Sequence, residues 1–501
     1  MRRISYLVTS LLLGTTFTNA QVSAYQADQI ADMVGCNTHF FWTGVYSDSF
    51  PTLKSRLQEL GVRHIRDTNF GSDTAFKDRI NQLAGIGIKS DIICEPWWTW
   101  PENLSYFKAI KYLPNAPIEF IEYPNELFHY PGVTASQCIT DYINFYNTYK
   151  GDTATAGIPL FGPSFSNNVT GPGQFIDSGG YDMTDKMDYG NLHCYPAGTY
   201  VEGPQGGGNG ISLDSDIDEY HLINKGNKPL AATETGYQLP FDTQWGVTDS
   251  VAAKYEPRML MWYLQKGIKY TYRYQLINDS DSLAGAANNN YGILNSDCSR
   301  RPSFYAIKNT IKLFTDPGPA FNPGALNYTL SGDTTGLQSM VFQKRNGVFL
   351  LVVWQAISSG TCSASPYGYN NPPVGVKVTV SGMAGGTALG YTPSFDSNSV
   401  ASFPSIDTMN INIPDHIYVL EITPTEVRAT STNIYPNPSS GIITISAQDK
   451  ITGITISDLM GQTLFSCKYN SQLVQINIAD LPAGVYFVKV DGHEVRKFVK
   501  E

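Results

Sequence analysis

Short apolar runs alternate with amphipathic helical stretches from Val34 to about Phe314, and this alternation constrains the fold more than any other feature of the chain. Such a pattern is typical of βα units around a parallel sheet. Eight strands are predicted, at Val34–Thr38, Val62–Asp67, Ile88–Cys94, Ile118–Tyr123, Pro159–Pro163, Tyr189–Tyr195, Pro229–Thr233 and Tyr270–Ile277. Helical spacing of apolar residues predicts helices at Thr52–Leu60, Thr74–Ala84, Ala135–Tyr149, Val251–Gln265 and Ser303–Phe314.

Eight units in about 280 residues match the size of a (β/α)8 TIM barrel, an α/β fold. The alternative is an open, doubly wound sheet. That fold would normally carry a glycine-rich phosphate loop after its first strand, where this chain has Asn37-Thr38-His39-Phe40-Phe41-Trp42. The barrel is therefore the favoured prediction, over residues 21–316.

The sequence pattern changes beyond Asp316, where apolar and polar residues alternate between turns rich in Gly, Ser and Pro. This predicts an antiparallel β-sandwich over residues 317–424, with the nearly all-apolar Val348–Trp354 as a strand covered on both sides. After the linker-like Thr423-Pro424-Thr425, residues 425–501 predict a small C-terminal β-domain. Its expected strands are Ile442–Ser446, Gly453–Asp458, Leu473–Ile478, Gly484–Val490 and Glu494–Val499.

Residues 1–20 have the pattern of a cleaved secretory signal peptide: Arg2 and Arg3, the apolar run Tyr6–Leu13, then small and polar residues. The apolar run is too short to span a bilayer, and no later stretch reaches the ~20 consecutive apolar residues that a membrane helix needs. We therefore expect a soluble mature protein outside the cytoplasm, with no membrane-spanning segment.

Charge and cysteine spacing argue against several function classes. The net charge of −10 offers no basic surface for a phosphate backbone, so no nucleic-acid partner is expected. The seven cysteines stand singly, without CxxC pairs or histidine clusters at metal-ligand spacing. We accordingly predict neither a metal nor a cofactor.

Polar residues follow nearly every predicted strand, at the end of a parallel barrel where the loops converge on one cavity. Two of them are carboxylates, Glu126 after the fourth strand and Glu234 after the seventh. Glycoside hydrolysis needs two carboxylates on opposite sides of the scissile bond. Either glutamate alone could be a helix cap or an ion-pairing residue, but two at these strand ends, among His, Tyr and Trp, favour a catalytic pair.

With these residues in place, the chain resembles the retaining glycoside hydrolases of the large (β/α)8 clan, clan A, over about residues 34–314. In that clan the acid/base glutamate follows an Asn, as in Asn125-Glu126, and the nucleophile ends an apolar strand, as Glu234 does. The resemblance implies that Arg66, His193 and Tyr195 orient the nucleophile, and that the sandwich is an accessory domain. One departure is that the clan usually has a Trp at the end of strand eight, where Tyr272–Asn278 has none.

Further residues are predicted to bind a carbohydrate substrate: His39, Trp42, Trp97, Trp98, Asn125 and Gln275. The run that contains Trp97, Trp98 and Trp100 has neither helical nor strand period, which suits stacking on sugar faces or, alternatively, packing on the barrel rim. Glu95 is interpreted as a substrate hydrogen-bonder or a surface group. His129 and Tyr130, just after Glu126, could equally line the cleft or lie outside it.

The tail also shows a resemblance. Asn433–Gly441, Leu481–Val490 and the terminal Arg496–Lys500 are similar, in order and position, to the C-terminal sorting domain of the type IX secretion system of Bacteroidota. This implies passage through the periplasm and across the outer membrane, with the secretion machinery as a partner and a secreted or cell-surface location. The alternative is a carbohydrate-binding or fibronectin-like module.

Together these features predict a secreted retaining glycoside hydrolase that cleaves β-linked poly- or oligosaccharides with two glutamates. A catalytically silent glycan-binding protein on a barrel scaffold is the alternative, although a binder needs neither glutamate.

Overall fold

The computed structural model describes residues 21–166, 171–177, 182–208, 210–226, 228–239, 246–278, 290–360, 368–424, 432–459, 461–491 and 494–501. The predicted signal segment, residues 1–20, lies outside them. The chain divides into two compact units, with the boundary between Thr423 and Pro424. The first unit holds the barrel and the sandwich, and the second holds the tail.

Eight parallel strands form the sheet of the first unit, in the order β7-β6-β5-β4-β3-β10-β9-β8. They are β3 (Val34–Asn37), β4 (His64–Thr68), β5 (Lys89–Ile93), β6 (Ile118–Glu122), β7 (Leu160–Phe161), β8 (Gly190–His193), β9 (Leu230–Thr235) and β10 (Ile268–Arg273). A parallel bridge between Phe161 and Tyr189 joins the two ends of the sheet, so that it closes. The predicted (β/α)8 barrel is confirmed.

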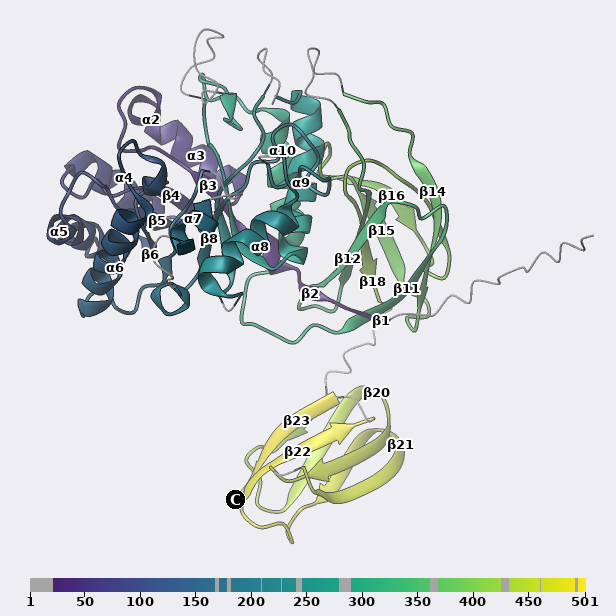
Figure 1. The fold of residues 1–501 in the computed structure, drawn as a ribbon. Helices are drawn as coiled ribbons and strands as arrows, with labels where there is room; N and C mark the ends of the chain where they lie inside the picture. The colour runs from purple at the N-terminus through teal and green to yellow at the C-terminus, as the bar shows by residue number, and fades with distance from the viewer. Residues whose placement is uncertain are drawn as a thin grey trace, which may run out of the picture. The chain divides into compact units, whose positions relative to one another are not determined.

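Helices surround this barrel (Figure 1). The longer ones are α3 (Phe50–Leu60), α4 (Thr74–Ala84), α5 (Trp100–Lys111), α6 (Ala135–Gly151), α7 (Gly171–Asp177), α8 (Leu213–Asn224), α9 (Asp249–Gln265) and α10 (Pro302–Phe314). Short helices are α1 (Asp28–Met33), α2 (Val45–Asp48), η1 (Leu127–His129) and η2 (Thr184–Lys186). Their starts follow from local chemistry: the Asp73 side chain accepts from the backbone at the start of α4, and Thr134 and Gln137 form a capping box on α6.

Aromatic rings fill the lower interior of the barrel, the half that lies away from the carboxyl ends of the strands. Phe120, Phe161 and Tyr272 are buried together, with Tyr189 and Tyr270 packed against them. Tyr272 fits because Gly35 faces it, since a Cβ there would lie 2.4 Å from the ring. A plugged lower half leaves the carboxyl ends of the strands as the place where side chains can meet around a cavity.

The sandwich consists of two antiparallel sheets that the N-terminal residues extend. One has the order β1 (Gln21–Ser23), β11 (Ala325–Gly332), β14 (Val374–Ser381), β17 (Met409–Ile413). The other has the order β16 (Ser399–Phe403), β15 (Thr387–Tyr391), β18 (Tyr418–Thr423), β13 (Phe349–Gln355), β12 (Leu337–Gln343), β2 (Tyr25–Gln26).

The placement of β1 and β2 differs from the expected barrel boundary at residue 21. β1 pairs antiparallel with β11 and β2 pairs parallel with β12, so both belong to the sandwich. Strands this short carry no readable hydrophobic period, and their partners lie about 300 residues further along the chain, so local pattern could not reveal the pairing.

Strand β13 is buried along its whole length, as its apolar run predicts. Leu350, Val352 and Trp354 join the core that includes the barrel helices, whereas the alternate residues Leu351 and Val353 face the core between the sheets. In Figure 1, α9 and α10 lie between the barrel strands and the sandwich. The sandwich therefore packs against the flank of the barrel.

The second unit contains β19 (Asn433–Tyr435), β20 (Ile442–Ser457), β21 (Thr463–Asn477), β22 (Gly484–Val490) and β23 (Glu494–Lys500), around its own apolar core. Two separate strands were expected where β20 runs as one, because irregular register between Ser446 and Gly453 interrupts the alternation without ending the strand. Among the described residues of both units, no helix has the length and apolarity to cross a bilayer.

Candidate active site

A cavity of about 550 Å³ opens where the barrel strands end. Nine of the eleven predicted site residues line it: His39, Trp42, Arg66, Trp97, Asn125, Glu126, His193, Tyr195 and Glu234. They come from loops or strand ends far apart in sequence, as expected for the carboxyl end of a parallel barrel.

Glu234, on β9, is held by two hydrogen-bond donors. Arg66 Nη1 donates to one carboxylate oxygen at 2.7 Å, and the Tyr195 hydroxyl donates to the other at 2.7 Å. Burial alone would raise the pKa of Glu234, but the neighbouring charges of His193 and Arg66 and the Tyr195 hydrogen bond outweigh it and bring the pKa well below its usual value. Glu234 is therefore an ionised carboxylate at neutral pH.

Arg66 is itself fixed by a carboxylate beneath the cavity. Glu122, fully buried at the end of β6, accepts from Arg66 Nε and Nη2, both at 2.7 Å. Asn37 and Asn125 each accept a further bond from the guanidinium, at 2.9 and 2.8 Å. Glu122 is not among the site residues predicted from the sequence, although a charged residue at the end of an apolar strand is a signal that could have identified it.

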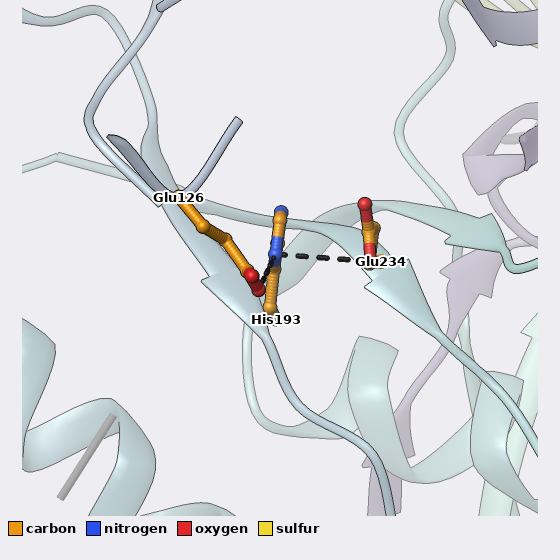
Figure 2. A group of neighbouring side chains, drawn as sticks. All are labelled: Glu126, His193 and Glu234. Carbon is orange, nitrogen blue, oxygen red and sulfur yellow. Dashed lines mark hydrogen bonds and ion pairs between the residues drawn. The ribbon is translucent and has the colours of Figure 1, made fainter. Parts of the chain in front are cut away.

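Glu126, in the loop after β6, has a strained backbone conformation, with φ 47° in the left-handed region. Its N–H donates to Ser164 Oγ at 3.1 Å, and its carboxylate lies 2.7 Å from His193 Nδ1. Figure 2 shows Glu126 and Glu234 on either side of His193. A quarter of the Glu126 side chain is exposed, against 12% for Glu234, so Glu126 is the more accessible of the two carboxylates.

His193 lies between the two glutamates. Its Nδ1 is 3.8 Å from Glu234 Oε2 as well as 2.7 Å from Glu126 Oε1, and its Nε2 is 3.1 Å from Thr233 Oγ1. Burial lowers the pKa of His193, but Glu234 and Glu126 together raise it above its usual value. One oxygen of each glutamate and a nitrogen of His193 lie within 4.8 Å of one another.

Such a triplet has the composition of a metal site, but its ligand atoms are already used. Arg66 and Tyr195 bond both oxygens of Glu234, and His193 Nδ1 bonds Glu126. A guanidinium 2.7 Å from the carboxylate also opposes a second cation there. The donor set fits a hydrogen-bonded pair of carboxylates better than a metal centre.

Aromatic side chains line the part of the cavity near Glu234. His39 stacks on Trp42 with ring centroids 4.0 Å apart, and burial lowers the pKa of His39 to about 4, so its ring is neutral at pH 7. Tyr274 and Tyr291 also line the cavity, and Tyr274 directly follows β10. A tyrosine thus occupies the region where the resembled clan usually has a Trp.

Two predicted site residues do not reach the cavity. Trp98 packs against Phe70 and Tyr106 on the barrel rim, because successive loop residues point in different directions and only Trp97 faces the opening. Gln275 is fully buried and accepts a hydrogen bond from Tyr46 at 3.2 Å. It supports the wall of the site from behind.

Comparison with known proteins agrees with this architecture. Residues 433–501 match the family model described as a secretion system C-terminal sorting domain. The tail is thus a type IX sorting domain, which indicates export across the outer membrane to the cell surface or beyond. No curated protein matches the chain.

Solved structures with the same fold include glycoside hydrolases. A family 39 glycoside hydrolase from Bacteroides cellulosilyticus WH2 shares 16% identity over 79% of this chain and 82% of its own, with a TM-score of 0.54. A family 39 enzyme from Xanthomonas axonopodis pv. citri shares 14% over 83% and 100%, at 0.53. A family 39 β-xylosidase from Caulobacter crescentus shares 13% over 80% and 98%, at 0.51. At these identities the likeness shows a shared fold of TIM barrel and β-domain.

Proposed function

We propose that this protein is a secreted retaining glycoside hydrolase, with Glu234 as nucleophile and Glu126 as acid/base. The observation that carries the proposal is the spacing of the two carboxylates, which bring one oxygen each within 4.8 Å. Retaining enzymes hold their carboxyl groups about 5–5.5 Å apart, whereas inverting enzymes need about 6.5–9.5 Å to admit a water molecule.

In the first step, a Glu234 oxygen attacks the anomeric carbon while Glu126 gives its proton to the departing glycosidic oxygen. The bond to the leaving group breaks, and a covalent glycosyl ester forms on Glu234. Arg66 and Tyr195 keep Glu234 ionised and oriented for this attack. Burial raises the pKa of the Tyr195 hydroxyl well above its usual value, so that it stays a donor.

In the second step, Glu126 takes a proton from water, whose oxygen attacks the same carbon and releases Glu234. Each displacement inverts the anomeric centre, and the two together retain its configuration. His193 contacts both glutamates. Its Nδ1 can donate a hydrogen bond to Glu126 whenever Glu126 becomes ionised during the cycle.

The substrates that we propose are β-linked poly- or oligosaccharides. Support comes from the aromatic lining of the cavity, which suits sugar faces, and from the fold shared with an enzyme named as a β-xylosidase. A catalytically silent glycan-binding protein is the other candidate. It does not explain why Glu122 and Arg66 hold Glu234 ionised at the bottom of the cavity.

Replacing Glu126 by Ala tests the assignment, after a glycan panel has identified a substrate. The change removes the proton donor, so hydrolysis of natural glycosides should fall by roughly 10²–10⁴-fold. Aryl glycosides with good leaving groups should lose far less, and azide should raise the residual rate by entering the space of the lost carboxylate. Equal losses on both substrate types, without azide rescue, would contradict the role of Glu126 as the acid.

A further inference from the structure

The wall of the cavity next to Glu126 differs from the wall next to Glu234. Glu95, Trp97 and Tyr130 are among the side chains that line the cavity, and we call these three the outer wall. The Trp97 and Tyr130 rings lie 6.0 Å apart between centroids, with planes inclined by 36°. Two loops therefore bring an aromatic pair and a carboxylate to one side of the opening.

Trp97 is 75% exposed, the largest value among the exposed large apolar side chains of the described residues. Keeping an indole in water forgoes the free energy that its burial would provide. Its neighbour Trp98 is packed on the rim, so the same loop buries one indole and presents the other. An exposed ring at the mouth of a cavity can pack against the apolar face of a sugar ring.

Glu95 is fixed in place while its carboxylate stays free to bind. Its N–H donates to Asn103 Oδ1 at 3.0 Å, and Asn103 Nδ2 donates to its carbonyl at 2.8 Å. Asn103 is fully buried and is held in turn by Asn69. Within the described part of the chain, no hydrogen bond uses the Glu95 carboxylate. Partial burial raises the pKa of this carboxyl group.

The outer wall lies on the acid/base side of the proposed catalytic pair. Tyr130 is the C-cap of η1, the short helix that begins directly after Glu126. Burial and the charges of Glu95 and Glu126 raise the pKa of its hydroxyl. For His39 and Tyr291, burial has the largest influence on the pKa, and the neighbouring carboxylate whose charge also acts on it is Glu234. Because the acid protonates the departing oxygen, groups beside Glu126 meet the part of the substrate that leaves.

We propose that Glu95, Trp97 and Tyr130 form a leaving-group subsite that selects an uncharged sugar residue, an inference that rests on the proposed glycosidase function. The sugar ring lies on Trp97 and Tyr130, and its hydroxyls donate to Glu95. Arg66 is the only Lys or Arg among the described residues that line the cavity, and it is bonded to Glu122 and Glu234. A uronic acid in this subsite would face the Glu95 carboxylate without a compensating cation.

The test compares two substrates with the same transferred sugar: a disaccharide that the wild type cleaves, and the corresponding glycosyl fluoride. Fluoride is too small to touch the outer wall. Trp97→Ala and Glu95→Gln should each lower kcat/KM on the disaccharide by about tenfold, equivalent to about 1.4 kcal/mol. On the fluoride they should change it by less than about twofold, equivalent to about 0.4 kcal/mol.

Tyr112→Ala and Asp218→Asn are matched controls, since both side chains are exposed and neither lines the cavity. Equal losses on fluoride and disaccharide would overturn the subsite while leaving the glycosidase function intact. A wild type that cleaves no member of the glycan panel and no glycosyl fluoride would instead contradict the function itself.

The charge selectivity has its own readout. A disaccharide with a uronic acid in the leaving position should be a poorer substrate than its neutral counterpart, and Glu95→Gln should narrow that difference. Equal wild-type rates on the two, or a preference for the uronic acid, would overturn the selectivity.

Discussion

The two ends of the barrel each contain a buried histidine against a glutamate, yet the two pairs differ in their surroundings. At the carboxyl end His193 Nδ1 lies 2.7 Å from Glu126, and at the opposite end His64 Nδ1 lies 2.6 Å from Glu119. The pKa of both histidines is raised by their carboxylate neighbours. A histidine–glutamate pair is therefore not by itself the mark of an active site.

The difference is what each pair faces. His64 also lies 3.7 Å from Asp32, which is half exposed and pairs with Arg63, so this cluster closes a charged network at the surface. His193 instead has a second carboxylate, Glu234, that is nearly buried and held by Arg66. Charge balanced at the surface supports the fold, whereas ionised groups that converge on a cavity can act on a substrate.

The largest expected effect is on turnover, and it appears when the removal of a carboxylate at the carboxyl end of the barrel, Glu234, is compared with the removal of one at the opposite end, Glu119. Glu234→Ala should reduce turnover to the uncatalysed background on every substrate, because the nucleophile is gone. Glu119→Ala should leave kcat unchanged in protein that is folded by circular dichroism. Substantial turnover by Glu234→Ala, or loss of turnover in folded Glu119→Ala, would remove the distinction between the two ends.

A smaller effect is expected on stability from His64→Gln. The raised pKa of His64, from its usual 6.5 to about 9, means that its pairing stabilises the fold fully below pH ~6.5 and is lost as the pH rises through about 9. The variant should be less stable than wild type by about 1.5–3 kcal/mol at pH 6. Thermal midpoints at pH 6 and pH 9.5 measure this.

The difference in thermal midpoint between wild type and His64→Gln should be smaller at pH 9.5 than at pH 6, while kcat per folded molecule stays the same. A difference in thermal midpoint that stays constant or grows with pH would show that His64 is not stabilised as a cation.

Much of this arrangement could be predicted from the sequence because it depends on local pattern. The apolar runs located all eight strands, and their ends located Glu126, Glu234 and Arg66, since the carboxyl end of a parallel barrel follows from strand direction alone. What pattern does not contain is where a loop side chain points. Trp97 and Trp98 are adjacent and chemically identical, yet only Trp97 faces the cavity.

Contacts between distant segments were equally hidden. Tyr291 reaches the cavity from a loop well beyond the last strand, and β2 pairs with a strand more than 300 residues later. Such pairings are decided by the packing of the whole unit, and no local period encodes them.

The smallest effect on either end of the barrel is expected from deleting residues 426–501. The tail has its own core and forms a separate compact unit, and every residue assigned to the site precedes it. kcat and KM of the purified protein should not change, whereas in the native host the truncated protein should remain in the periplasm. A folded but inactive truncation would show that the tail takes part in substrate binding.

The configuration of the first-formed product tests the central claim most directly. Proton NMR of the reducing sugar during the first minutes of hydrolysis, before mutarotation, reports which anomer the enzyme releases. Two carboxylates this close predict double displacement, so a β-linked substrate should release the β-anomer first. Initial release of the α-anomer would contradict the assignment of Glu234 as nucleophile and Glu126 as acid/base.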